Sequence, residues 1–329
     1  MFDTKVGVIG TGSMGRNHVR VFSEIADLVG VCDIDTKATR EISKKFGCMA
    51  FSKVDKFLQE TGVEVVTVST PTTTHKEIVL KCLRAGVDVL VEKPISDTVE
   101  NAQEILDEAN SNGRVFGVGM IERHNPVVQF TRELIEKGEL GQLVTMMSRR
   151  VSNYPRRIKD VGVVTDLGVH DIDVLRYLCD CKVISVYALG GNIKDSKHED
   201  HATILMMFEN GVEGVVEASW LTPMKLRKIT LTGVEGVAEM DYMDQNVSIS
   251  TSSTFNKDKF DLWRLPQIYD TRRIRVKNEE PLKRELEDFL RSAKERRDPM
   301  VTGHDGLRTL MIAKAAEESI RTGKKVDIQ

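Results

Sequence analysis

The chain has 329 residues, with 47 basic and 50 acidic side chains and a net charge of −3. That balance argues against a dedicated nucleic-acid or membrane-surface protein, because both usually carry a basic excess. No apolar run approaches the roughly 18 residues that a membrane span needs, and five scattered cysteines do not suggest a disulfide framework. The first residues enter a strand-like pattern without a secretion signal. We therefore expect a cytoplasmic protein of about two domains.

The first part of the chain alternates short apolar runs with helix-period segments. The apolar runs cover 5–10, 28–33, 63–69, 87–92 and 114–119, and the helical patterns cover 13–25, 36–46, 74–85 and 98–110. Strands that alternate with helices are typical of right-handed crossovers and of a parallel sheet with helices on both faces. The pattern predicts a doubly wound α/β domain over residues 1–122.

The rest of the chain has a different pattern. Helix-period segments cover 126–137, 164–178, 281–294 and 305–321, and strand-like runs cover 143–151, 183–190, 201–208, 212–219, 226–232, 236–242 and 246–251. Strands that follow one another with few helices between them are typical of antiparallel sheets. We expect an α+β domain with a large, mostly antiparallel sheet over residues 123–329.

The first predicted strand leads into the run GTGSMG, residues 10–15, and then into a helix. Glycines at this spacing permit a tight turn and close approach of a pyrophosphate, and the helix N-terminus offers free N–H groups to it. The alternative is a tight strand-to-helix turn without a ligand. An acid that closes the second strand favours the ligand. The sequence predicts a dinucleotide site formed by Gly10, Gly12, Ser13, Met14, Gly15 and Asp33.

Asp33 also bears on which dinucleotide binds. A carboxylate at this position accepts hydrogen bonds from a free ribose 2′-hydroxyl and repels a 2′-phosphate. Its neighbours Ile34 and Asp35 supply no cation that would hold such a phosphate. We therefore expect NAD rather than NADP.

Two further motifs place ionisable groups where chemistry is plausible. Glu92-Lys93-Pro94 ends a parallel strand, and open α/β sheets bind ligands at that end. A partly desolvated lysine there can exchange a proton with a substrate hydroxyl; the alternative is a surface lysine. Asp166 and His170 are four residues apart, so on a helix they share one face. They could form an acid–base pair or a solvated salt bridge.

The motifs GTGSMG, STPTTTH (69–75), VEKP (91–94) and DLGVHDID (166–173) together resemble the glucose–fructose oxidoreductase/inositol dehydrogenase family (Gfo/Idh/MocA) over nearly the whole chain. The resemblance implies a Rossmann domain before the sheet domain, a cis Lys93–Pro94 bond, and an oxidoreductase in which Lys93 works with Asp166 and His170 on the substrate. It also implies a cofactor site lined by Thr70, Pro71, His75, Glu92 and Lys93.

One departure concerns the substrate. Many family members carry a glycine-rich run before the DLGVHD-type motif, whereas this chain reads DVGVVT at 160–165. The departure puts in doubt any transfer of substrate contacts from enzymes of small free polyols. The segments 119–129, 153–164 and 217–236 resemble a branch of the family that oxidises the C3 hydroxyl of UDP-N-acetylglucosamine to a ketone.

A basic segment supports the same substrate class. Arginine side chains bind phosphate oxygens bidentately, so the four arginines before the DLGVHD motif are predicted to hold a diphosphate: Arg149, Arg150, Arg156 and Arg157. The alternatives are a solvated basic loop, an enzyme of free cyclitols or hexoses in which the arginines are idle, and a non-catalytic NAD-binding sensor. A sensor would be expected to lose Lys93 or His170, and both are present.

Two further features of the sequence bear on metal binding and on self-association. Neither Cys179-Asp-Cys181 nor His198-Glu-Asp-His201 has the spacing of a usual metal site, so no metal is predicted. The strands 202–208 and 212–218 have apolar residues at consecutive positions, which makes both sheet faces partly apolar. Soluble monomers rarely leave such a face bare, and we expect a homodimer or homotetramer formed through this sheet.

Overall fold

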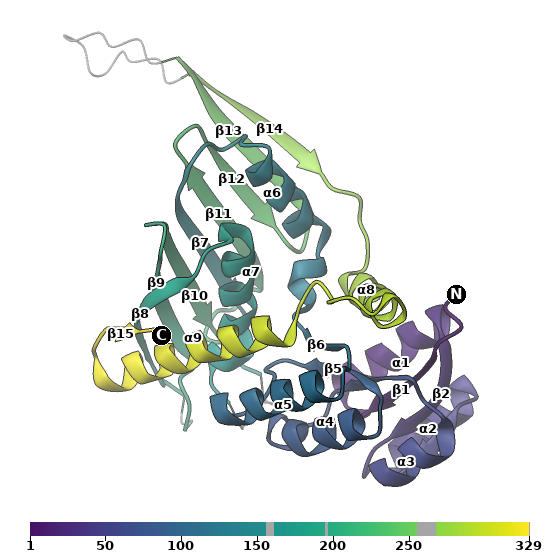
Figure 1. Cartoon of the computed structure of the whole chain (residues 1–329). Coiled ribbons are helices and arrows are strands. Elements are labelled where there is room, and N and C mark those ends of the chain that lie inside the picture. The colour runs from purple at the N-terminus through teal and green to yellow at the C-terminus, as the bar shows by residue number, and fades with distance from the viewer. Residues whose placement is uncertain (156–160, 195–196, 255–267, 329) are drawn as a thin grey trace, which may run out of the picture. The chain divides into compact units, whose positions relative to one another are not determined.

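The computed structural model describes residues 1–155, 161–194, 197–254 and 268–328 (Figure 1). Contacts divide the chain into two compact units. Unit 1 comprises Met1–His124 and Glu280–Met311, and unit 2 comprises Asn125–Glu279 and Ile312–Gln329. The first division lies close to the expected boundary at 122, but the segment Glu280–Met311 packs with the first unit instead of belonging to the second. None of the described helices is both long enough and apolar enough to span a membrane.

Unit 1 is built on a six-stranded parallel sheet of order β3-β2-β1-β4-β5-β6, which confirms the predicted doubly wound fold. Its strands are β1 (Lys5–Ile9), β2 (Asp27–Cys32), β3 (Met49–Phe51), β4 (Val65–Val68), β5 (Asp88–Glu92) and β6 (Phe116–Gly119). The helices are α1 (Ser13–Ile25), α2 (Thr36–Phe46), α3 (Val54–Thr61), α4 (His75–Arg84) and α5 (Val99–Ser111). The strand order reverses between β1 and β4, where such folds bind ligands.

Local chemistry sets the helix ends in unit 1. The Asp35 side chain accepts hydrogen bonds from the N–H groups of Lys37 and Ala38, so it caps α2. Gly47 ends that helix with a φ of +73°, a conformation that glycine adopts without strain. At α5 the cap is Thr98, whose hydroxyl accepts from the N–H of Asn101.

Two helices from late in the sequence complete unit 1. Helix α8 (Pro281–Glu295) packs against α1 and against the short 3₁₀ helix η2 (Ile121–His124). Its buried apolar stripe of Leu282, Leu286 and Phe289 joins the core around α1. Helix α9 (Gly303–Thr322) begins in unit 1 and ends in unit 2.

Unit 2 contains, in the described residues, a nine-stranded sheet of order β14-β13-β12-β11-β7-β10-β9-β8-β15. Only the β10–β7 pairing is parallel, which confirms a mostly antiparallel sheet. The strands are β7 (Leu143–Val151), β8 (Val183–Gly191), β9 (His201–Phe208), β10 (Glu213–Ser219), β11 (Leu226–Gly233), β12 (Gly236–Asp241), β13 (Asn246–Thr254), β14 (Ile268–Arg275) and β15 (Val326–Asp327). Strand β13 extends beyond the predicted run 246–251 to Thr254.

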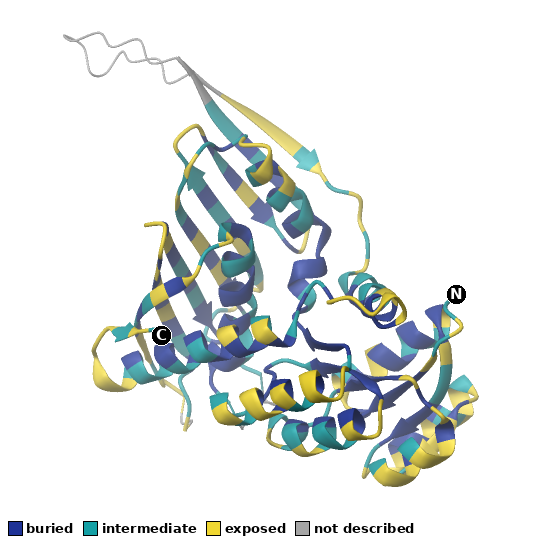
Figure 2. Cartoon of the chain, viewed as in Figure 1, coloured by how far each residue is buried: buried dark blue, intermediate teal, exposed yellow. Residues whose placement is uncertain are grey.

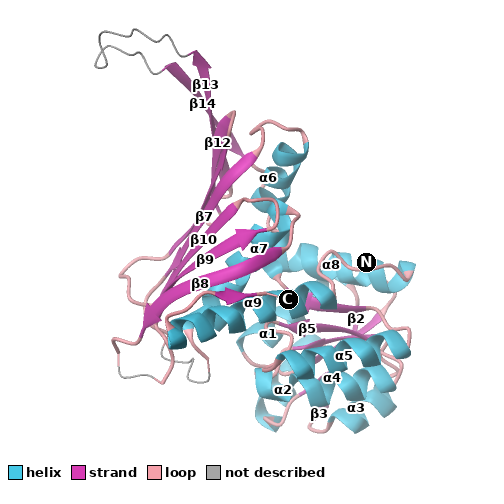
Figure 3. Ribbon diagram, turned by 60° about the vertical axis from the view of Figure 1, so that its left-hand side comes forward, coloured by secondary structure: helices cyan, strands magenta, loops and turns pink. Residues whose placement is uncertain are grey.

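Helices α6 (Pro126–Glu136) and α7 (Val169–Cys179) cover one face of this sheet (Figure 3). Burial alternates along the strands, as the banding in Figure 2 shows, and β9 alternates regularly from Ala202 to Phe208. Inward side chains such as Ile204 and Met206 form the core with the helices. Outward residues, including Leu205 and Met207, remain exposed.

Candidate functional site

The glycine turn in unit 1 has the shape of a phosphate cradle. Gly10 has a φ of +92°, and a Cβ on Gly15 would overlap the Gly10 carbonyl oxygen, so both positions require glycine for the turn itself. A Cβ on Gly12 would meet nothing within 4 Å. Gly12 is also the cap residue of α1 and supplies no side-chain cap bond. The turn therefore offers open space and uncapped N–H groups, which fit a dinucleotide pyrophosphate.

Asp33 stabilises the cradle from the end of β2. Its Oδ2 accepts hydrogen bonds from the Thr11 N–H (2.6 Å) and from the Thr11 hydroxyl (2.9 Å). Its Oδ1 accepts from the Asp35 N–H at 2.9 Å. A carboxylate has about four lone-pair sites, so Asp33 can still accept from a ribose hydroxyl. The Asp33 carboxylate thus holds the phosphate-binding turn and can also accept a hydrogen bond from the ribose.

His75, one of the predicted cofactor residues after β4, contacts the backbone of two loops in the structure. His75 is buried, and its ring contacts two backbone oxygens: Nδ1 lies 3.0 Å from Pro94 O and Nε2 lies 2.9 Å from Thr70 O. Burial lowers the pKa of His75 despite those bonds. His75 therefore ties the loop at Thr70-Pro71 to the loop after β5, so its described contacts are those of a scaffold for both loops.

Glu92 and Lys93 stand at the carboxyl end of β5, and the Lys93–Pro94 bond is cis as expected. Glu92 Oε1 lies 2.9 Å from His18 Nε2, and its Oε2 accepts a 3.2 Å bond from the Lys93 N–H. Burial opposes ionisation of Glu92, but its interactions with His18 and Lys93 outweigh that cost and lower the pKa of the carboxyl. An ionised carboxylate thus adjoins the lysine.

In unit 2, Asp166 and His170 come together at the start of a helix, although not on a regular one. Asp166 lies in a π-helical turn, Val164–Gly168, and His170 lies in the first turn of α7. π-Helical turns occur frequently at functional sites. Both residues are half-buried, so their side chains combine a restricted position with access to a ligand.

Acidic residues elsewhere in unit 2 anchor this turn. The Val164 N–H donates to Glu199 Oε1 at 3.1 Å, and the Thr165 hydroxyl donates to Glu317 at 2.6 Å. Burial raises the pKa of Glu199. Next to it, buried Asp200 accepts from the N–H groups of Ile193 and Lys194. The acids of the segment 198–201 therefore have structural partners.

The arginines of β7 do not form the expected cradle. Successive side chains in a strand point to opposite faces of the sheet, and Arg149 and Arg150 do so. Arg150 faces the helices with its side chain 2% exposed, and its Nε and Nη2 donate to Asp171 Oδ1 at 3.0 and 2.8 Å. Arg149, 55% exposed, pairs with Glu217 on the other face. The expectation that Arg150 binds substrate is therefore wrong, because burial against Asp171 leaves it no access.

Arg149 is separated from Arg150 and from the α7 side of the sheet, so these two arginines cannot grip one diphosphate together. Arg156 and Arg157 lie outside the described residues.

Two ionisable residues of unit 1 were missed by the sequence analysis. His18 is buried on α1, and Glu285 is buried on α8. Glu285 occupies the i+3 position after Leu282 in the apolar stripe of its helix. The sequence alone indicates Glu285, because this acid lies among the apolar residues of a helix stripe that should be buried. Carboxyl groups are almost never fully buried unless they are paired.

Comparison with known proteins identifies the chain's relatives. Residues 4–120 match the description "Oxidoreductase family, NAD-binding Rossmann fold", and residues 128–239 match the GFO/IDH/MocA C-terminal domain. UDP-N-acetylglucosamine 3-dehydrogenase of Acidithiobacillus ferrooxidans is 28% identical over 95% of this chain and 96% of its own. Myo-inositol 2-dehydrogenase of Thermotoga maritima is 24% identical over 99% of this chain and 98% of its own.

Solved structures agree with the fold. A structure of the Acidithiobacillus ferrooxidans enzyme superposes with a TM-score of 0.88 at 26% identity, covering 97% of this chain and 98% of that one. An Agrobacterium radiobacter oxidoreductase, solved with NAD+, L-tartaric acid and magnesium, gives 0.88 at 18% identity over 99% and 98% of the two chains. With its glycine cradle, Asp33 and the motifs around Lys93 and His170, the chain is an NAD-binding member of the Gfo/Idh/MocA oxidoreductase family.

Proposed function

We propose that this oxidoreductase oxidises the C3 hydroxyl of UDP-N-acetylglucosamine to a ketone with NAD. The observation that carries the dehydrogenase part is the position of Lys93, next to an ionised carboxylate at the strand end of an NAD-binding sheet. The substrate part is supported by similarity to the Acidithiobacillus ferrooxidans enzyme, which extends over 95% of the chain.

Each residue has a definite task in this proposal. Bound NAD supplies the hydride acceptor, and the open turn at Gly12 together with Asp33 holds it. Lys93 takes the hydroxyl proton on its Nζ as the alcohol becomes a ketone, which is general base catalysis. Asp166 and His170 orient the reacting hydroxyl, since both are half-buried side chains with hydrogen-bonding groups. For the diphosphate, Arg156 and Arg157 remain the proposed contacts.

A free cyclitol is the second candidate substrate. It is favoured by the similarity to myo-inositol 2-dehydrogenase of Thermotoga maritima over 99% of the chain and by the absence of a shared diphosphate site on the two β7 arginines. Without a diphosphate, the basic segment would have no part in substrate binding.

The purified protein with NAD and a panel of sugars separates the two candidates. The panel contains UDP-N-acetylglucosamine, UDP-glucose, free N-acetylglucosamine, myo-inositol and scyllo-inositol. We expect NADH formation, and a product lacking two hydrogens by mass spectrometry, with UDP-N-acetylglucosamine. UDP should compete with the sugar nucleotide and not with NAD. Turnover of an inositol without inhibition by UDP would favour the second candidate.

We further propose that the sheet face opposite α6 and α7 binds a second copy of this chain. Support comes from exposed Met147 and Leu205 on either side of half-buried Val215, since Met147 is in register with Val215 and Val215 with Leu205. Such a row fits a sheet-to-sheet contact. Light scattering should give a multiple of 36.9 kDa, and Met147→Glu with Leu205→Glu should reduce it to the single-chain mass. A single-chain mass for the unmutated protein would contradict the proposal.

A further inference from the structure

The interior of unit 1 holds a group of three ionisable side chains, of which only Glu92, beside Lys93, has a part in the proposed function. His18 comes from α1, Glu92 from the end of β5 and Glu285 from α8. The side chain of His18 is 0% exposed, that of Glu92 is 11% exposed, and Glu285 as a whole is 2% exposed. Burying a charged group without a partner is costly, so this arrangement needs an explanation.

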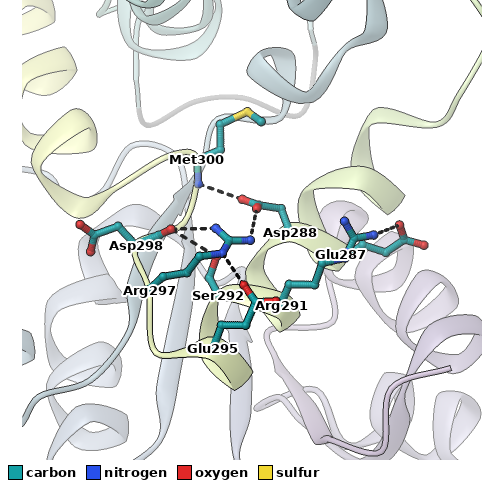
Figure 4. A network of polar contacts seen from close by, with 8 residues as sticks. All are labelled: Glu287, Asp288, Arg291, Ser292, Glu295, Arg297, Asp298 and Met300. Carbon is teal, nitrogen blue, oxygen red and sulfur yellow. Dashed lines mark hydrogen bonds and ion pairs between the residues drawn. The ribbon is translucent and has the colours of Figure 1, made fainter.

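Helix α8 is held firmly in the position that buries Glu285. One turn after Glu285, Asp288 accepts hydrogen bonds from Arg297 Nη2 at 3.1 Å and from the Met300 N–H at 2.8 Å (Figure 4). At its start, Glu280 forms an ion pair with Arg20 of α1. The inward position of Glu285 is therefore fixed by contacts on both sides of it.

Two polar groups in this interior have no hydrogen-bond partner among the described residues. They are Nδ1 of His18 and both carboxyl oxygens of Glu285. The helices that carry them, α1 and α8, pack against each other. Unsatisfied buried polar atoms are few in native proteins, and each one calls for an explanation. A carboxylic acid that donates across one water to the imidazole Nδ1 would give both side chains a hydrogen-bond partner.

The surrounding charges favour this protonated form of Glu285. Burial raises the pKa of Glu285 well above its usual value, and the charges of Glu92, Asp288 and Glu122 raise it further. The pKa of Glu92 is lowered. Two acids whose environments push their pKa values apart divide into a proton carrier and an anion. The packed elements carry further ionisable groups: Arg16, Arg20 and Glu24 on α1, Lys93 after β5, Arg123 and His124 on η2, and Lys283, Arg284, Glu287, Arg291, Lys294 and Glu295 on α8.

We propose that Glu285 is a positioning residue, which fixes the His18 ring so that His18 in turn fixes the Glu92 carboxylate beside Lys93. The inference rests on the proposed function, because it assigns Lys93 the role of base. With His18 Nδ1 occupied by the Glu285 donor, Nε2 carries the proton that it donates to Glu92. A carboxylate held in one position keeps its effect on the neighbouring Lys93 constant.

Glu285→Gln and Glu285→Leu form a matched pair for the activity test. Glutamine keeps the shape and a neutral donor, so kcat should stay within about 3-fold of that of the original protein, and the pH profile of kcat should not move. Leucine keeps the bulk without a donor, so kcat should fall about 10-fold and the acidic limb of the pH profile should move. The KM for NAD should change little in either variant. An unchanged pH profile in the leucine variant, or equal loss in both variants, would overturn the proposal.

A second measurement needs no substrate, so it separates failure of this inference from failure of the proposed dehydrogenase activity. Nitrogen-15 NMR of the His18 ring reports whether Nδ1 accepts a hydrogen bond and whether Nε2 carries the proton. We expect this state in the original protein and in Glu285→Gln, and its loss in Glu285→Leu. The same ring signals in all three proteins would overturn the inference, even if the sugar panel identifies a substrate.

Stability supplies a third readout with a definite sign. Because the folded-state pKa of Glu285 is raised, its contribution to stability is fully present below the unfolded-state pKa of about 4.5 and is lost as the pH rises through the folded-state value. Glu285→Gln removes this dependence. The Tm of the glutamine variant should therefore rise relative to the original protein as the pH increases from 4 to 8. A constant Tm difference across that range would contradict a buried, protonated Glu285.

Discussion

The two units place their charged residues differently. In unit 1, Asp33 directly follows β2, and Glu92 and Lys93 end β5, so these side chains share the carboxyl edge of one sheet. In unit 2, Arg149 and Arg150 lie within β7, where alternation sends one to each face. Two residues that are adjacent in the sequence, such as Glu92 and Lys93, therefore share one edge of the sheet when they lie at a strand end. Adjacent residues inside a strand, such as Arg149 and Arg150, lie on opposite faces.

The largest effect should come from the strand-end residue Lys93. Removal of a general acid–base group typically lowers the rate by about 10²–10⁴, so Lys93→Ala should lose that much turnover while keeping NAD affinity. His170→Ala, the partner from unit 2, should lose turnover in the same range. Turnover in the oxidation assay and NAD titration by fluorescence check both. Nearly full turnover in the Lys93 variant would refute its role as the base, and nearly full turnover in the His170 variant would refute its role in orienting the hydroxyl.

Within β7 the largest effect should be on stability. Breaking a buried ion pair from one side costs about 3–5 kcal/mol, so Arg150→Met should lower the free energy of unfolding by that amount. Adding Asp171→Leu removes the unpaired carboxylate and should recover much of the loss. Denaturant unfolding of the single and double variants checks this. A single variant as stable as the original protein would show that the Arg150–Asp171 pair does not stabilise unit 2.

Strand ends and strand interiors also differ in how well the sequence predicted them. The alternating pattern identified both folds, and the glycine turn with Asp33 predicted NAD, in agreement with the NAD-binding family to which the chain belongs. Alternation also predicts that Arg149 and Arg150 diverge, but not which of them is buried. That choice depends on Asp171, a carboxylate in α7 that neutralises Arg150. For α8, only tertiary packing against α1 shows that the helix belongs to unit 1.

An intermediate effect is expected at the other strand end. Since Asp33 favours a free ribose hydroxyl and no adjacent cation offsets its charge, NAD should bind at least about 10-fold more tightly than NADP. Asp33→Ala should narrow that ratio, although it also removes the bonds that hold Thr11. Asp35→Asn, which changes the cap of α2 two residues later, is the control and should keep the ratio. Equal affinity of the unmutated protein for both cofactors would contradict the assignment.

The smallest effect should come from Arg149, and it decides how β7 takes part in substrate binding. The Arg149 side chain is exposed on the face opposite α7 and pairs with Glu217 of the neighbouring strand β10. An exposed pair contributes about 0–1 kcal/mol, so Arg149→Ala should change stability by no more than that. The KM for a UDP-sugar should stay within about 2-fold, because a diphosphate held near His170 would lie on the other side of the sheet. An arginine that grips a diphosphate contributes about 1.5–3 kcal/mol. An increase of about 10-fold in KM would therefore return Arg149 to the substrate site and would mean that strand alternation does not separate it from the reacting sugar.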